Sequence, residues 1–131
     1  MRGLRRLMSA ILMLAVTGSG AYQAAGEDPP KYTIAQVMQM AHKPPAKGQP
    51  SLLITILQGK ASRQDKEKLL DLYTALGQNK LPRGDAKSWK GKTEALVNAA
   101  RSILAEEKGA GEKLKNATTC MACHDVHKAD D

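Results

Sequence analysis

From residue 27 onward, apolar residues recur at intervals of three and four, which predicts helices, and no useful stretch alternates with the period of a strand. The first predicted helix begins at Thr33, where Gln36 completes a capping box three residues later. It ends near Lys43, because two prolines follow and cannot continue a helix. Its apolar face is formed by Ile34, Val37, Met38 and Ala41.

Two shorter apolar segments follow a proline-rich loop. Segment 51–58 is rich in Leu and Ile and could form a buried strand, but the chain offers no partner strand. We therefore predict a short helix there, ended by Gly59. Ser62 with Asp65 then opens a further helix, which Gly77 is expected to end.

The C-terminal half predicts a long helix over 85–108 and a last helix over 112–127, separated by two glycines. The loops are short, so neighbouring helices should run antiparallel. The chain is therefore predicted to be a single all-α domain. One face of the last helix is expected to carry Leu114, Ala117, Met121 and His124.

The first 26 residues have a different character. Three arginines precede an apolar run over 7–16, and the residues up to 26 are small and polar. This order is typical of a secretory signal peptide, and the run is short for a membrane span. Cleavage after Ala21 or Gly26 would leave one mature domain, 27–131, in the periplasm, without stable membrane insertion. An uncleaved membrane anchor is the alternative.

The net charge and the aromatic content limit the classes of function that fit this chain. Loss of the three arginines in the signal lowers the formal charge from +7 to about +4, and the lysines are scattered, which argues against nucleic-acid binding. The mature segment has no Phe, and its large aromatic residues are Tyr32, Tyr73 and Trp89. A flat apolar cofactor would supply the bulk that this core lacks.

The two cysteines lie in Cys120-Met121-Ala122-Cys123-His124, the C-x-x-C-H pattern of covalent haem attachment. Two thiols one short turn apart can bond the two vinyl groups on one porphyrin edge, and the next residue lies under the ring. We therefore predict one haem c per chain, with thioether bonds from Cys120 and Cys123 and His124 as the proximal iron ligand. A helix places Cys120 and His124 on one face.

Three other functions of these residues have less support from the sequence. A redox disulfide of Cys120 and Cys123 belongs beside a βαβ pattern, which is missing here. A zinc site of Cys120, Cys123, His124 and His127 would lack the longer loop that usually separates ligand pairs. A purely structural disulfide is a third alternative.

The motif lies on the last helix and therefore resembles the class II cytochromes c, the cytochrome c prime group. In that family two residues, an aromatic residue and a basic residue follow the motif, and here His127 replaces the aromatic residue while Lys128 matches the basic one. The resemblance implies an antiparallel four-helix bundle holding the haem between its helices. An Arg common in the family's first helix is absent. The chain also resembles small exported class II-type cytochromes whose first helix ends in Ala41-His42-Lys43.

The resemblance implies that the first helix faces the open side of the iron. Met38 on the apolar face is the candidate distal ligand, and His42 one turn later is the alternative. His127 is too close to His124 on the same helix to cross the ring plane, and Lys128 could pair with a haem propionate.

Two functions follow from these options. A six-coordinate iron suits single-electron transfer with redox protein partners, whereas an iron without a distal ligand would bind a small gas such as NO. No catalytic acid–base pair, activated nucleophile or phosphate loop is visible, so no enzyme is predicted. Monomer and homodimer both remain open.

Overall fold

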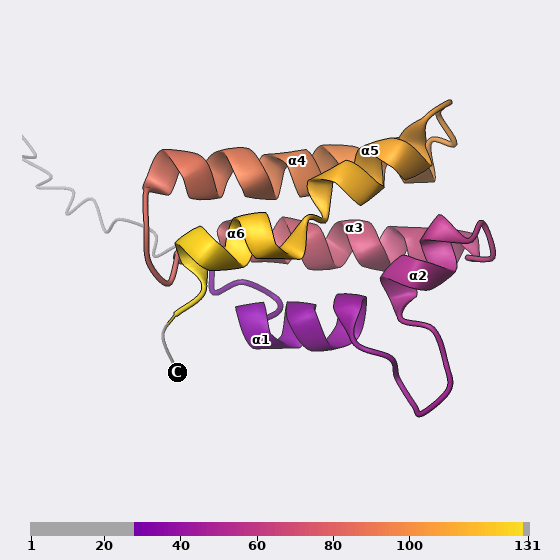
Figure 1. Ribbon diagram of the computed structural model, residues 1–131, viewed down its shortest axis with the longest axis horizontal. Coiled ribbons are helices and arrows are strands. Elements are labelled where there is room, and N and C mark those ends of the chain that lie inside the picture. The colour runs from indigo at the N-terminus through magenta and orange to yellow at the C-terminus, as the bar shows by residue number, and fades with distance from the viewer. Residues whose placement is uncertain (1–27, 130–131) are drawn as a thin grey trace, which may run out of the picture.

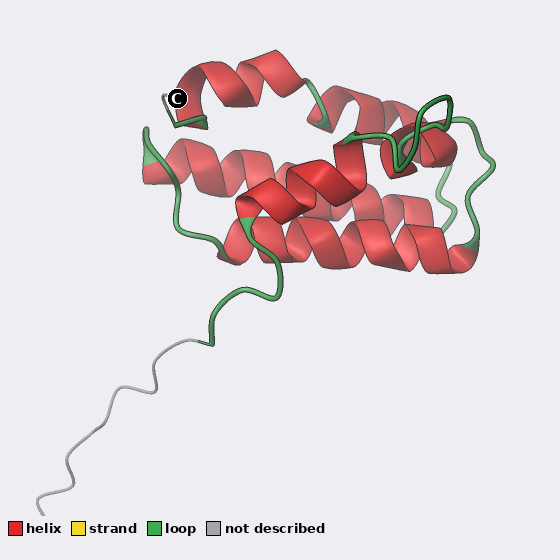
Figure 2. Cartoon of the chain, turned by 90° about the horizontal axis from the view of Figure 1, so that it is seen from below, coloured by secondary structure: helices red, strands yellow, loops and turns green. Residues whose placement is uncertain are grey.

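The computed structural model describes residues 28–129, which form helices and loops and contain no strand (Figure 2). This confirms the all-α prediction for that range. The signal peptide predicted over 1–26 lies outside the described residues. No helix within 28–129 has the length and apolar character needed to cross a membrane. The helices are α1 (Ile34–Val37), the π-helix η1 (Met38–His42), α2 (Leu52–Leu57), α3 (Arg63–Gln78), α4 (Ala86–Leu104), α5 (Ala110–Ala117) and α6 (Cys120–His127).

Side-chain caps fix where the N-terminal helices begin. The backbone N–H of Gln36 donates to the Thr33 hydroxyl, and the Gln36 side chain accepts from the Thr33 N–H, so the predicted capping box is present. Ser62 and Asp65 form the same reciprocal pair at the start of α3. Ser51 caps α2, which confirms the short helix predicted over 51–58. α1 runs directly into η1, so together they form the predicted first helix.

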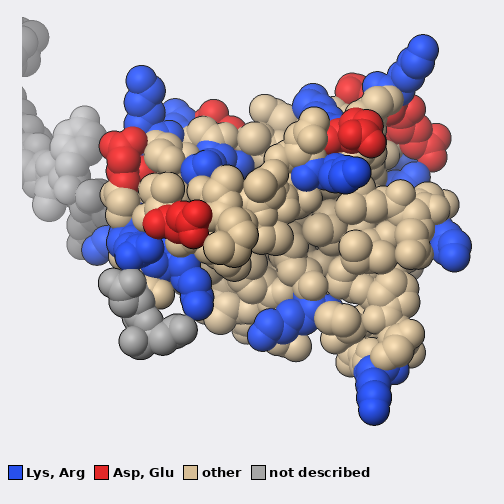
Figure 3. Space-filling model, in the orientation of Figure 1, with Lys and Arg blue, Asp and Glu red and all other residues tan. Residues whose placement is uncertain are grey.

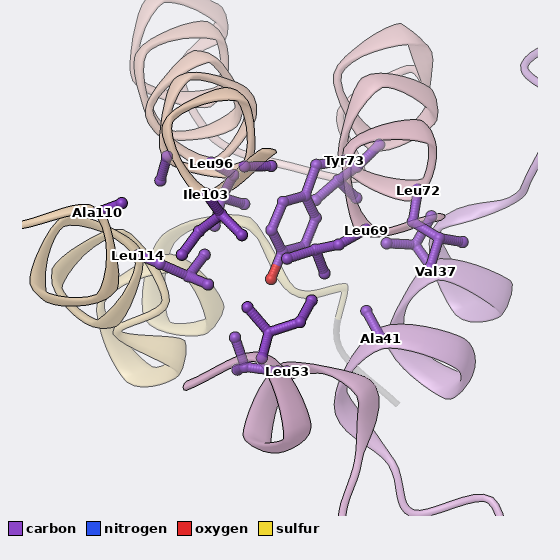
Figure 4. Packing of buried hydrophobic residues seen from close by; sticks show 14 of the residues in the cluster. Val37, Ala41, Leu53, Leu69, Leu72, Tyr73, Leu96, Ile103, Ala110 and Leu114 are labelled. Carbon is purple, nitrogen blue, oxygen red and sulfur yellow. The ribbon is translucent and has the colours of Figure 1, made fainter. Parts of the chain in front are cut away.

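The long helices α3 and α4 lie side by side and run antiparallel (Figure 1). α5 folds back against α4, while α1 and η1 pack along α3 and α2 closes one end. The apolar faces of these helices meet in one cluster (Figure 4). Tyr73 projects from α3 into the middle of this cluster and is fully buried, as are Leu69 and Leu72 on the same helix. Trp89 of α4 also packs into the core.

The single helix predicted over 112–127 is wrong, because the chain forms α5 and α6 with a break between them. The Thr118 hydroxyl donates to the carbonyl of Leu114, and the Thr119 hydroxyl donates to the carbonyl of Asn116. The backbone of Thr118 and Thr119 leaves the helical region, with ψ of 31° and 89°. Threonine hydroxyls that bond to backbone carbonyls give the chain an alternative to the continuous helix.

The break also disrupts the apolar face expected along that helix. Leu114 is fully buried, but Met121 has 66% of its surface exposed. The prediction assumed one continuous helix, in which these side chains share a face. The break at the two threonines interrupts the helical period, so residues on either side of it no longer share that face.

Two other boundaries differ from the prediction. α3 continues through Gly77 and ends at Gln78, where the Asn79 N–H bonds back to carbonyls of the last turn. Gly77 instead lies against Thr93 of α4, whose hydroxyl would be 3.4 Å from an added Cβ. α4 ends at Leu104 rather than near residue 108, in a turn where Glu106 adopts a positive φ.

The helix break can be tested with a matched pair of truncations. We expect Leu114→Ala to lower the free energy of unfolding by about 2–5 kcal/mol, because it opens a cavity in the core. Met121→Ala should change it by about 0.5 kcal/mol or less, because that side chain is exposed. Urea denaturation of the full chain measures both. Equal losses would indicate one continuous apolar face.

Candidate functional site

The C-x-x-C-H motif occupies the start of α6, directly after the break. Both cysteines are free thiols: Cys120 is exposed, with its sulfur 3.3 Å from the carbonyl oxygen of Thr118, and Cys123 is partly buried. His124 lies one turn after Cys120 and is also partly buried. The helix therefore brings the two thiols and the imidazole onto adjoining positions of one short element, as predicted.

α6 is set apart from the other helices of residues 28–129, because it has no extended packing against any of them (Figure 2). The inner faces of α3, α4 and α5 pack against other helices along their length. Residues 120–124 of α6, which form the motif, lack such packing against the described helices. Within α6, the side chain that is fully enclosed by protein is His127, at the opposite end from the cysteines.

His42, at the end of η1, lies near the motif. Its Nε2 is 3.3 Å from the hydroxyl oxygen of Tyr73, and the two rings are 5.8 Å apart between centroids. Burial lowers the pKa of His42, and the charge that His124 carries when protonated lowers this pKa further. This electrostatic effect indicates that His42 and His124 belong to the same region of the protein.

The two cysteines also interact electrostatically with residues of this region. Burial raises the pKa of the Tyr73 hydroxyl, and the Cys120 thiolate raises it further. Burial also raises the pKa of the Cys123 thiol, and this effect is opposed by the nearby positive charge of Lys92 on α4. The site is thus formed by residues of η1, α3, α4 and α6.

The first helix carries two methionines, of which Met38 lies on the apolar face, as its helical position predicted. Met38 is partly buried and packs against the hydrophobic cluster, whereas Met40 is 40% exposed. η1 is a π-helix, a rare form that is often found at functional sites. Met38 opens it and His42 ends it, so the two candidate distal ligands are the two ends of one π-helical turn.

Both ring nitrogens of His127 are within hydrogen-bond distance of other residues of the protein. This residue is 1% exposed, with Nδ1 2.9 Å from the carbonyl oxygen of Arg83 and Nε2 3.0 Å from the hydroxyl of Ser88. Its ring meets Trp89 edge to face, with the centroids 5.4 Å apart. The sequence analysis considered His127 as a zinc ligand and as a replacement for an aromatic residue, and it missed these hydrogen bonds.

This arrangement weakens the zinc alternative. Within residues 28–129, no three His, Cys, Asp or Glu side chains gather as a metal-binding group would require. Both nitrogens of His127 already have partners, so the fourth ligand of a zinc site is occupied elsewhere. Lys128 ends α6, where its backbone N–H donates to the carbonyl of His124 at 3.1 Å, and its side chain is exposed.

The donor set fits a covalently attached porphyrin. It consists of two free thiols spaced for two vinyl groups, an imidazole one residue beyond them, and a second imidazole at the end of η1. Comparisons with protein-family models, curated proteins and solved structures find no match for this chain. The functional argument therefore depends on this motif and its surroundings.

Proposed function

We propose that the protein is an exported monohaem c-type cytochrome that passes single electrons between redox proteins of the periplasm. The observation that carries this proposal is the C-x-x-C-H sequence on α6, with two free thiols one turn apart and His124 directly after them. His124 would be the proximal ligand of a haem iron, and the imidazole of His42 at the end of η1 is available as a distal ligand.

Each residue of the motif has a defined part. The thiols of Cys120 and Cys123 each add across one vinyl double bond, with sulfur joining one carbon and hydrogen the other, so no group is released. His124 supplies the proximal nitrogen. The bound haem supplies a one-electron couple between ferric and ferrous iron.

The proposed architecture is a four-helix bundle of the class II type. Its members are the first helix (α1 with η1), α3, α4 and the pair α5–α6. The support for this is the antiparallel pairing of α3 with α4 and the packing of α5 on α4 and of α1 on α3. α6 would pack on the haem, which accounts for its lack of extended contact with the other helices.

His42 is the better-supported distal ligand. It is partly buried, and the charge of a protonated His124 contributes to lowering its pKa, whereas Met38 is packed into the apolar cluster one turn earlier. Coordination through Nε2 of His42 would replace its hydrogen bond with Tyr73. A pair of histidine ligands gives a lower reduction potential than a histidine with a methionine.

One observation favours the alternative function, binding of a small gas such as NO. The Tyr73 hydroxyl already holds Nε2 of His42. If that hydrogen bond persists and Met38 stays in the apolar cluster, the iron would have no distal protein ligand and could bind a diatomic molecule.

The charge distribution suits a redox partner better than a nucleic acid. Lysine and arginine side chains are spread over the face shown in Figure 3, with acidic side chains among them. Nucleic-acid binding favours a continuous basic patch or stripe instead. We propose neither enzymatic activity nor a stable membrane association for the mature chain, and its dimerisation is a question for solution measurements.

Haem attachment is tested first. In a host that matures c-type cytochromes, the protein should carry one haem that stays bound after denaturation, because the thioethers are covalent. Cys120→Ala/Cys123→Ala should lose all covalent haem. Mass spectrometry and the visible spectrum measure this. A colourless wild-type protein with the mass of the bare chain would refute the proposal.

The distal ligand is tested by substitution. We expect His42→Ala to convert a low-spin haem spectrum to a high-spin one, because the iron loses its sixth ligand. Met38→Ala should leave the low-spin bands in place, as should Met40→Ala, the exposed control on the same helix. If Met38→Ala alone removes the low-spin bands, methionine is the ligand. A wild-type protein that is already high-spin would support gas binding.

A further inference from the structure

The loop between α3 and α4 holds the C-terminal end of α6. The carbonyl oxygen of Arg83 lies 2.9 Å from Nδ1 of His127, and Nη2 of Arg83 donates to the carbonyl of Asp125 at 3.0 Å. Ser88, in the first turn of α4, lies 3.0 Å from Nε2 of His127. We refer to His127 and its partners Arg83, Gly84, Ser88 and Trp89 as the His127 clamp.

Gly84 allows the loop to approach α6 this closely. Its φ is +90°, a conformation that disfavours other residues. A Cβ at this position would lie 2.7 Å from the carbonyl oxygen of Val126 and 3.0 Å from Nδ1 of His127. Both the conformation and the space therefore require glycine.

The hydrogen bonds assign the proton on the His127 ring. A carbonyl oxygen only accepts, so Nδ1 must carry the hydrogen that it donates to Arg83. Nε2 is then available to accept a hydrogen bond from the Ser88 hydroxyl. The imidazole uses both nitrogens, and its edge-to-face contact with Trp89 fixes the plane of the ring.

α6 depends on this clamp because it has little else to hold it. A helix of eight residues is marginal on its own in water, and α6 lacks extended packing against the other described helices. His124 lies one turn before His127 on the same helix, so a shift or rotation of the clamped end also moves the His124 ring.

We propose that His127 is a positioning residue for His124: the clamp sets the orientation in which the proximal imidazole meets the iron. This inference rests on the proposed haem function. The clamp gives the buried histidine a role that an aromatic residue at the same position could fill only in part, since a phenyl ring would contact Trp89 without the two hydrogen bonds.

Three substitutions separate the parts of the clamp in the haem-loaded protein. His127→Phe keeps a ring against Trp89 and removes both hydrogen bonds. His127→Asn offers an amide N–H near the place of Nδ1, so it keeps a donor for the Arg83 carbonyl. Ser88→Ala removes the partner of Nε2 alone, and Val126→Ala is the control, because that neighbouring side chain is partly exposed.

We expect His127→Phe to retain one covalent haem and to speed amide hydrogen exchange over 120–128 by about 30-fold, the effect of losing two buried hydrogen bonds. Its reduction potential and low-spin spectrum should both shift relative to the wild type. His127→Asn should restore most of the wild-type potential, Ser88→Ala should give a smaller shift, and Val126→Ala should give none.

The outcomes distinguish this inference from the proposed function. A wild-type protein without haem overturns the proposed function. A haem-loaded His127→Phe protein with unchanged exchange over 120–128 shows that no clamp operates. Faster exchange with an unchanged potential and spectrum shows that His127 only stabilises the fold, and it overturns the positioning role. If His127→Phe does not fold, the potentials of His127→Asn and Ser88→Ala decide in the same way.

Discussion

The two hydrogen bonds of the buried His127 ring are the interaction on which the candidate site depends. They join the end of α6 to a helix start 39 residues earlier and to a loop 44 residues earlier in the chain. α6 is short and otherwise lightly packed, so its thiols and the His124 imidazole have a defined place only while these bonds hold. The position of the motif residues therefore depends on the contacts of His127, a residue outside the motif.

Most of the fold could be predicted from the sequence, because its signals are local. Capping pairs such as Thr33 with Gln36 act over three residues, and helical periodicity needs only one apolar face. The break at Thr118 and Thr119 was missed for the opposite reason. The apolar spacing of Leu114, Ala117 and Met121 continues across the break, and only the hydrogen bonds of the threonine hydroxyls interrupt the helix.

The candidate site could be predicted only in part. The C-x-x-C-H spacing identifies the two cysteines and His124 directly. The choice between Met38 and His42 depends on what each side chain meets in the folded chain. The contact of His42 with Tyr73 joins residues 31 positions apart, and no pattern along the sequence encodes it. The hydrogen bonds of His127 were missed because their partners, Arg83 and Ser88, lie 44 and 39 residues earlier in the chain.

The long separation between Arg83 and His127 affects how the chain would mature. The contacts of α3 with α4 and of α4 with α5 join neighbours in the sequence, and such local contacts form readily during folding. The bond between Arg83 and His127 closes a loop of 44 residues and needs the extreme C-terminal helix. The helical core can therefore assemble before α6 docks, which would leave both thiols accessible for the proposed haem attachment.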